Sequence, residues 1–287
     1  MDFKITQKEQ IPKRVCAIHD LSCIGRCALT VVMPVLSQMG LQVIPLPTAL
    51  LSTHTGGYTD FSFLGLTDEM TKIRAHFDKM GTDFDCVYSG FLGDEAQIEF
   101  VLDFAQSQRK KNGALFFADP VMGDDGIKYQ TYTDEMCRLT REIAKKADII
   151  TPNLTEACLL LGTDYNESLS ESEIKDMLDA LSEGGKTSVV ITGVTDGDSK
   201  IGARYFDRDS RTYGSHFTKK LSVSYPGTGD AFSSVVLGAL LSGLDLDSAV
   251  HGAVSYVFKA ISLTYKMGTT VREGILLESL KIDINNK

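Results

Sequence analysis

The sequence has few prolines, no long hydrophobic run and no excess of basic residues. Of its 287 residues, 7 are proline, and 29 Lys and Arg stand against 38 Asp and Glu, a formal net charge of −9. Broad binding to nucleic acid or to an anionic membrane requires clustered basic residues, so we expect neither. The longest largely apolar stretch, residues 231–244, contains three serines and two glycines. It is shorter than the roughly 20 residues that a bilayer span needs.

The six cysteines include no Cys-x-x-Cys pair and are scattered along the chain. In a chain of this length, such cysteines are typical of reduced thiols rather than of a disulfide framework. Residues 1–14 are polar and charged, which does not predict a signal peptide. We therefore expect a cytoplasmic protein.

Short apolar segments alternate with segments of helical periodicity along most of the chain. The strands that this pattern predicts are residues 14–19, 42–46, 86–89, 114–118, 149–151 and 188–192. The predicted helices are residues 26–39, 68–80 with Thr67 as N-cap, 95–108, 134–146, 155–161, 170–181, 230–242 and 246–264. Residues 20–25 and 51–58 read as loops. Residues 200–206 and 212–217 alternate in polarity around a charged turn, as in an antiparallel hairpin.

This alternation predicts an α/β fold with a doubly wound, mainly parallel central sheet, helices on both faces and a small antiparallel edge hairpin. Dividing the length by about 150 residues suggests two domains. However, no segment has the composition of a linker, so we predict a single domain over residues 1–287. Ligands of such sheets lie beyond the carboxyl ends of the strands. The polar residues that follow each strand are therefore the candidates for a site.

The sharpest motif is Gly-Thr-Gly-Asp at residues 227–230, directly before a long apolar helix. Glycines at a helix N-terminus let backbone N–H groups converge on an anion, which the helix dipole also favours. Asp230 could accept a proton from an attacking hydroxyl, or it could simply cap its helix. The motif alone leaves both interpretations open.

Carboxylates follow two successive strands. Asp119 and Asp124 come after residues 114–118, and Asn153 and Glu156 come after residues 149–151. Oxygen ligands at this edge suit Mg²⁺, which commonly bridges protein carboxylates and substrate phosphates. The structural alternative is that these are loop acids and a helix capped by Asn153.

Polar residues also end the first two strands. Asp20 follows His19, and His54 and Thr55 lie in a glycine-bearing loop, where they could bind a small polar acceptor. Either histidine could instead be structural and bonded to a backbone carbonyl. No serine, histidine and acid have the spacing of a nucleophile elbow, so acyl transfer is not expected.

Taken in order, the segments HDLS, STHTGG, DPVMGD, TPNLTE, VVIT and GTGDAF resemble the ribokinase superfamily and, within it, the pyridoxal kinases. The resemblance spans roughly residues 14–267. It implies a ribokinase-like fold, a homodimer, and transfer of the ATP γ-phosphate to the 5′-hydroxymethyl group of pyridoxal, pyridoxine or pyridoxamine, the vitamin B6 vitamers. The implied cofactors are ATP as co-substrate, Mg²⁺ and a monovalent cation such as K⁺.

The resemblance also implies a role for each site residue. Asp230 would be the catalytic base, with the N–H groups of Gly227, Thr228 and Gly229 as the anion hole. The implied substrate-binding residues are Asp20, His54, Thr55, Phe91 and Val121. The implied nucleotide-binding residues are Asp119, Thr151, Asn153, Glu156 and Thr192, and the implied metal-binding residues are Asp124 and Glu156.

Two residues depart from the family pattern. Asp20 stands where well-known members carry Ser, which could favour a cationic vitamer such as pyridoxamine, and Phe91 replaces a Tyr. Two alternatives remain open at this point. One is hydroxymethylpyrimidine kinase, which typically has Cys in place of Asp230 and lacks the HTGG loop. The other is a non-catalytic B6 or nucleotide carrier, for which the acidic residues would have no use.

Overall fold

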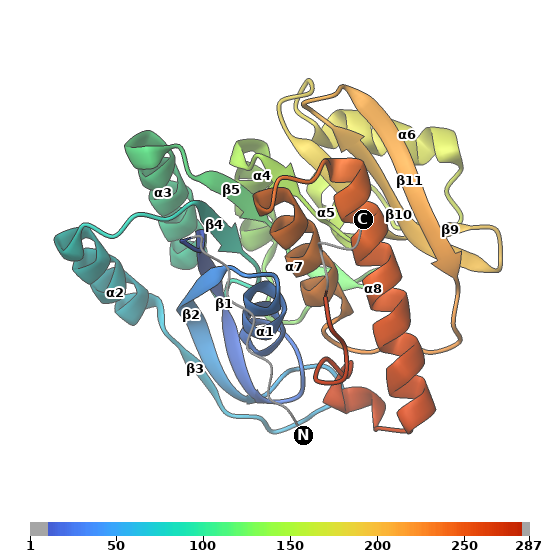
Figure 1. Ribbon diagram of the computed structural model, residues 1–287, viewed down its shortest axis with the longest axis horizontal. Helices are drawn as coiled ribbons and strands as arrows, with labels where there is room; N and C mark the ends of the chain where they lie inside the picture. Colours follow the sequence, from blue (N-terminus) through green and yellow to red (C-terminus); the bar gives the residue numbers. More distant parts are fainter. Residues whose placement is uncertain (1–10, 283–287) are drawn as a thin grey trace.

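A twisted nine-stranded sheet forms the centre of the molecule (Figure 1). We describe residues 11–282 of a computed structural model. The strand order is β11 (Thr212–Lys219), β10 (Lys200–Asp207), β9 (Ser188–Asp196), β8 (Ile149–Ile150), β5 (Leu115–Ala118), β4 (Cys86–Ser89), β1 (Arg14–Ile24), β2 (Gln42–Thr53) and β3 (Phe63–Gly65). The strands from β9 to β2 in this order are parallel, and the edge strands are antiparallel. The predicted fold class and edge hairpin are confirmed.

Helices cover both faces of the sheet. One face carries α1 (Leu29–Gln38), α7 (Thr228–Leu241) and α8 (Leu246–Met267). The other carries α2 (Thr67–Met80), α3 (Glu95–Asn112), α4 (Asp134–Lys146), α5 (Leu154–Leu161) and α6 (Glu171–Leu181). Alternate residues of β1 enter the two cores, Val15 and Ala17 on one side and Cys16 and Ile18 on the other. Burial on both sides explains why the strand is continuously apolar.

The first two strands are longer than the sequence predicts. Residues 20–25, expected as a turn, continue β1 as far as Ile24, and β2 runs through part of the expected loop as far as Thr53. The extensions pair with each other, Ser22 with Leu51 and Ile24 with Thr53. The two prolines within β2 are tolerated because β3 pairs only with residues 49–51, so the missing N–H groups face an open edge.

Other boundaries differ for reasons that lie outside the local sequence. Helix α1 begins at Leu29 rather than residue 26, because Ala28 has a φ of 48° and a ψ of −130°, outside the helical region. Thr67 does not cap α2, since its hydroxyl donates to Asp94 at 2.5 Å and Leu66 is the N-cap residue. The short elements β3, β6 (Gly123–Asp124), β7 (Ile127–Lys128) and the 3₁₀ turn η1 (Val271–Glu273) were not predicted.

Within the described part of the chain, no helix has the length and apolar character needed to cross a membrane. Residues 1–10, most of the polar segment that does not predict a signal peptide, lie outside the described residues. The parallel strands all end at one edge of the sheet, and α7 begins there in front of them (Figure 1). This arrangement brings polar residues from distant segments together.

Candidate active site

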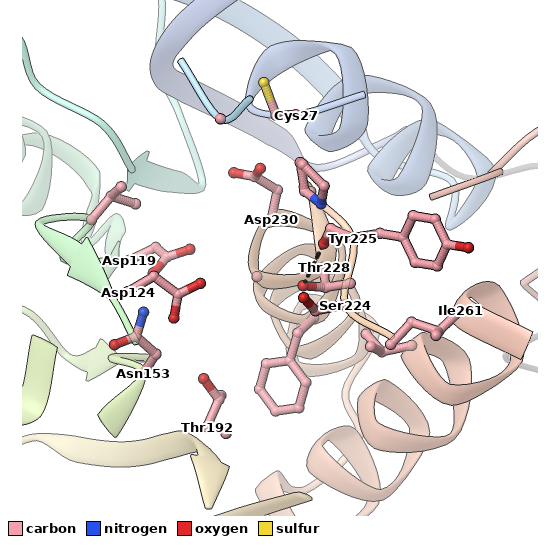
Figure 2. A pocket seen from close by; sticks show the side chains of 18 of the residues that line it. Cys27, Asp119, Asp124, Asn153, Thr192, Ser224, Tyr225, Thr228, Asp230 and Ile261 are labelled. Atoms are coloured by element: carbon pink, nitrogen blue, oxygen red, sulfur yellow. Dashed lines mark hydrogen bonds between the residues drawn. The ribbon is translucent and has the colours of Figure 1, made fainter. Parts of the chain in front are cut away.

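A cavity of about 600 Å³ opens where the parallel strands end. Every residue to which the family resemblance assigns a role lines this cavity. Its walls come from the end of β1, the loop after β2, the segments after β5 and β8, and the start of α7. In Figure 2, the carboxylates of Asp119 and Asp124 point into the cavity from one side and that of Asp230 from another. The structure thus brings the candidate residues together, and their individual roles remain predictions.

Helix α7 begins at the cavity with an N-terminus that no side chain caps. Its N-cap residue, Gly227, has a φ of 81°, and a Cβ there would lie 2.1 Å from the Arg26 carbonyl oxygen, so the position requires glycine. The Thr228 hydroxyl turns back to donate to the Tyr225 carbonyl oxygen at 3.2 Å (Figure 2). The first N–H groups of the helix are therefore left for a ligand, and the helix dipole favours an anion such as phosphate.

The Asp230 carboxylate is fixed by a backbone donor from a distant part of the chain. Its Oδ2 accepts a hydrogen bond from the Ala28 N–H at 2.8 Å, and Ala28 has a φ of 48°, a strained value for a residue other than glycine. Because Gly227 is the N-cap residue, the interpretation of Asp230 as a helix cap does not hold. Burial raises the pKa of Asp230 to about 6, and the nearby Asp20 charge adds to the increase. Such a pKa suits a general base near neutral pH.

Asp119 is linked to α7 through a buried serine. Its Oδ2 accepts a hydrogen bond from the Ser233 hydroxyl at 3.1 Å, and the Ser233 and Thr151 hydroxyls lie 2.8 Å apart. Burial raises the pKa of Asp119, and the Asp230 charge raises it further. One helix therefore carries Asp230 and, one turn later, the serine that holds Asp119. Sequence reasoning missed Ser233, because a serine in an apolar helix carries no signal of its own.

Asn153 and Glu156 are bonded to each other at the start of α5. The Asn153 side chain caps the helix, and Glu156 accepts from the Asn153 N–H at 2.8 Å and from the Met122 N–H at 3.2 Å. Asn153 is therefore a helix cap, as the structural alternative states. Glu156 is buried, and burial followed by the Asp119 charge raises its pKa. Both carboxylate oxygens of Glu156 already accept backbone N–H groups, which restricts how it could bind a metal.

Asp124 is the more exposed carboxylate of this group, although partial burial raises its pKa. Among residues 11–282, no three side chains of His, Cys, Asp or Glu converge closely enough to hold a metal ion. A cation here would need further oxygen ligands from a bound phosphate. This is the usual way in which Mg²⁺ is bound at nucleotide sites.

The cavity is also lined by Asp20, His54, Thr55, Phe91 and Val121. The two ring nitrogens of His54 are both engaged within the protein. Nδ1 accepts the Gly56 N–H at 3.1 Å, and Nε2 lies 2.6 Å from the Arg272 carbonyl oxygen, which assigns the proton to Nε2. The geometry thus favours a structural role for His54, bonded to a backbone carbonyl. Any contact with a substrate would be through the face of its ring.

His19 has no place in the cavity. It is buried against Tyr88, with ring centroids 4.4 Å apart, and burial lowers its pKa to about 3. It is therefore a neutral core residue, but it lacks the bond to a backbone carbonyl that the structural alternative expects, since neither ring nitrogen has a hydrogen-bond partner among the described residues.

An apolar section of the cavity was not predicted from the sequence. Ile201 of β10, Val223 after β11, and Phe258 and Ile261 of α8 line the end near Thr192. Such a surface suits a flat aromatic ring. Apolar residues at helical spacing normally indicate core packing. The sequence pattern does not distinguish a core residue from one that lines a cavity.

Comparison with known proteins agrees with this arrangement. The family model described as phosphomethylpyrimidine kinase matches residues 19–274. The pyridoxal kinase of Bos taurus is 30% identical over 220 residues, which cover 70% of this chain and 69% of that protein. The crystal structure of pyridoxal kinase from Lactobacillus plantarum is 30% identical with a TM-score of 0.85, covering 93% of this chain and 94% of that one.

A second solved structure comes from Bacteroides thetaiotaomicron. It is described as a candidate phosphomethylpyrimidine kinase, and one crystal form is reported with pyridoxal. It is 44% identical, has a TM-score of 0.89, and covers 93% of this chain and 94% of that one. The fold, the matched segment and these relatives agree. The chain belongs to the phosphomethylpyrimidine kinase family of ribokinase-like proteins, in which it is related to the pyridoxal kinases.

Proposed function

We propose that the chain transfers the γ-phosphoryl group of ATP to the 5′-hydroxymethyl group of a vitamin B6 vitamer. The observation that carries this proposal is the placement of Asp230, whose carboxylate the Ala28 N–H fixes beside the uncapped N-terminus of α7. A base and an anion site within the same turn of helix are what an attacking hydroxyl and a transferring phosphoryl group need. Kinship with pyridoxal kinases supports the choice of acceptor.

In this proposal, Asp230 transfers the proton and the other residues of the cavity bind the two substrates. Asp230 would accept the proton of the 5′-hydroxyl, and the N–H groups of residues 227–229 would bind the phosphoryl oxygens. The apolar section beside Ile201 and Phe258 would hold the adenine ring, with Thr192 at its edge. His54 and Phe91 would position the vitamer ring, which excludes water from the reacting atoms.

The carboxylates of Asp119, Asp124 and Glu156 fit Mg²⁺, because they are oxygen donors with no cationic partner among residues 11–282. Asp124 and Glu156 would hold it, directly or through water, and the ion would neutralise phosphate charge when bound. We also propose that the enzyme takes a monovalent cation such as K⁺, beside Thr151 and Thr192, which line the cavity. We further propose that residues 1–287 form one kinase domain that acts in the cytoplasm as a homodimer.

The test is ADP release from ATP in the presence of pyridoxal, pyridoxine, pyridoxamine or hydroxymethylpyrimidine, each supplied alone with Mg²⁺. We expect release with at least one vitamer at a kcat/KM well above that with hydroxymethylpyrimidine. Turnover with hydroxymethylpyrimidine alone would identify the kinase of thiamine synthesis instead. Binding of ATP and vitamers without release of ADP would identify a carrier.

A further inference from the structure

Asp20 is a buried carboxylate that lines the cavity. The residue is 7% exposed, and its Oδ2 accepts one side-chain hydrogen bond, from the Ser22 hydroxyl at 2.9 Å. Burial raises its pKa to about 6, against the opposing effects of the bonds from Ser22 and from its own N–H. The group therefore remains largely ionised at neutral pH, and water has little access to it.

Within residues 11–282, no basic side chain forms an ion pair with this carboxylate. The cavity is lined by five carboxylates, on Asp20, Asp119, Asp124, Glu156 and Asp230. None of the five forms an ion pair within residues 11–282.

The basic side chains that line the cavity, Lys219 and His54, do not pair with the Asp20 carboxylate. Lys219 ends β11, which five other strands separate from β1, where Asp20 lies. Both ring nitrogens of His54 are engaged elsewhere, since Nδ1 accepts the Gly56 N–H and Nε2 lies 2.6 Å from the Arg272 carbonyl oxygen. Neither is therefore free to donate to Asp20. Since buried charges are normally paired, the missing partner of Asp20 is expected in the ligand.

The position of Asp20 relative to Asp230 specifies which part of a vitamer would supply this charge. Asp20 and Asp230 line the same cavity, and Asp230 is bonded to the N–H of Ala28, the residue next to Cys27. The Asp20 charge raises the pKa of Asp230, and both charges raise the pKa of the Cys27 thiol. If Asp230 receives the 5′-hydroxymethyl group, its neighbour meets the adjacent ring substituent at position 4. That substituent is an aldehyde in pyridoxal, a hydroxymethyl group in pyridoxine and a protonated aminomethyl group in pyridoxamine.

We infer that Asp20 is a specificity-determining residue that selects pyridoxamine, through its ammonium group, over the vitamers whose 4-substituent is uncharged. This inference rests on the proposed function, since it assigns a partner within the same acceptor site. A charge-assisted hydrogen bond to a buried carboxylate is among the stronger polar contacts in proteins. Asp119 and Asp124 point into the cavity from a different side than Asp230 does (Figure 2), and the proposed function assigns both, together with Glu156, to Mg²⁺ and the phosphates.

The test compares kcat/KM for the three vitamers in the wild type, in Asp20→Asn, and in Asp198→Asn as a control for net charge. Asp198 lies in the turn between β9 and β10, away from the cavity. We expect Asp20→Asn to lower kcat/KM for pyridoxamine by roughly 10- to 100-fold, with a much smaller change for pyridoxal and pyridoxine. Equal losses for all three vitamers would show that Asp20 binds a group common to them and would overturn the inference.

A second measurement uses only the wild-type protein and decides the question if Asp20→Asn does not fold. Pyridoxamine and 4-deoxypyridoxine differ by an ammonium group, so their dissociation constants report the charge interaction. We expect pyridoxamine to bind at least about 10-fold more tightly. Equal or weaker binding of pyridoxamine would overturn the inference. Failure of the proposed function has a different signature, in which the wild type phosphorylates none of the three vitamers.

Discussion

Replacing Asp230 by Asn removes the proposed base and keeps most of the local geometry. The amide oxygen of Asn can accept the Ala28 N–H that Asp230 accepts at 2.8 Å, so the start of α7 should keep its conformation. General base catalysis contributes roughly 10²- to 10⁴-fold to a rate, and we expect kcat to fall by this factor. Affinity for ATP should change little, because the anion site consists of backbone N–H groups.

The same substitution should stabilise the fold. Burial raises the pKa of Asp230 from 3.8 to about 6, which means that folding disfavours its ionised form. This cost is fully present above the folded-state pKa and absent below about pH 4, where Asp230 is protonated in both states. The upper limit of this free-energy cost, from the pKa shift, is about 3 kcal/mol. Water in the cavity reduces the cost, so we expect Asp230→Asn to raise the free energy of unfolding by roughly 1–2 kcal/mol at neutral pH.

Two assays on the same samples test this reasoning. Steady-state turnover gives the loss in kcat, and thermal unfolding at neutral and at acidic pH gives the stability change, roughly 2–4 °C per kcal/mol for a chain of this size. Asp198→Asn serves as the control. Near-normal turnover of Asp230→Asn would refute the assignment of the base, and a variant less stable than the wild type at neutral pH would refute the electrostatic argument.

Three further predictions concern the same site. Gly227→Ala should destabilise the fold by more than about 1 kcal/mol and abolish turnover, because the added Cβ would lie 2.1 Å from the Arg26 carbonyl oxygen; thermal unfolding together with kcat checks this. Ser233→Ala should raise the Mg²⁺ concentration needed for half-maximal turnover, because Asp119 loses its hydroxyl donor, and an unchanged metal titration would contradict that role. Activity should fall as the pH drops through about 6, where Asp230 becomes protonated, and a profile of log kcat/KM that stays flat down to pH 4 would contradict this.

Much of the fold could be predicted because its parallel strands are buried on both faces. The apolar runs at β4, β5 and β9 are short, continuous and separated by helical segments, which leaves few other arrangements. The extension of β1 could not be predicted in this way. Residues 20–24 read as a turn locally and become a strand only because β2 pairs with them.

The site residues that could be predicted are those that directly follow a strand or stand at the start of a helix. Strand ends identified Asp20 and Asp119, and the glycines before α7 identified Asp230. The N–H of Ala28, which fixes Asp230, could not be identified, since any residue type has a backbone donor. The apolar residues that line the cavity, such as Phe258, could not be predicted either, because they have the same sequence pattern as core residues.

Phosphorus NMR of the wild-type protein with ATP, Mg²⁺ and a B6 vitamer tests the central claim most directly, because it follows the transferred group itself. The account predicts that ADP and a new phosphomonoester, the 5′-phosphate of the vitamer, appear in equal amounts, and that neither forms at a comparable rate with Asp230→Asn. Formation of inorganic phosphate in place of the phosphomonoester, or an unchanged ATP spectrum with every vitamer, would contradict it.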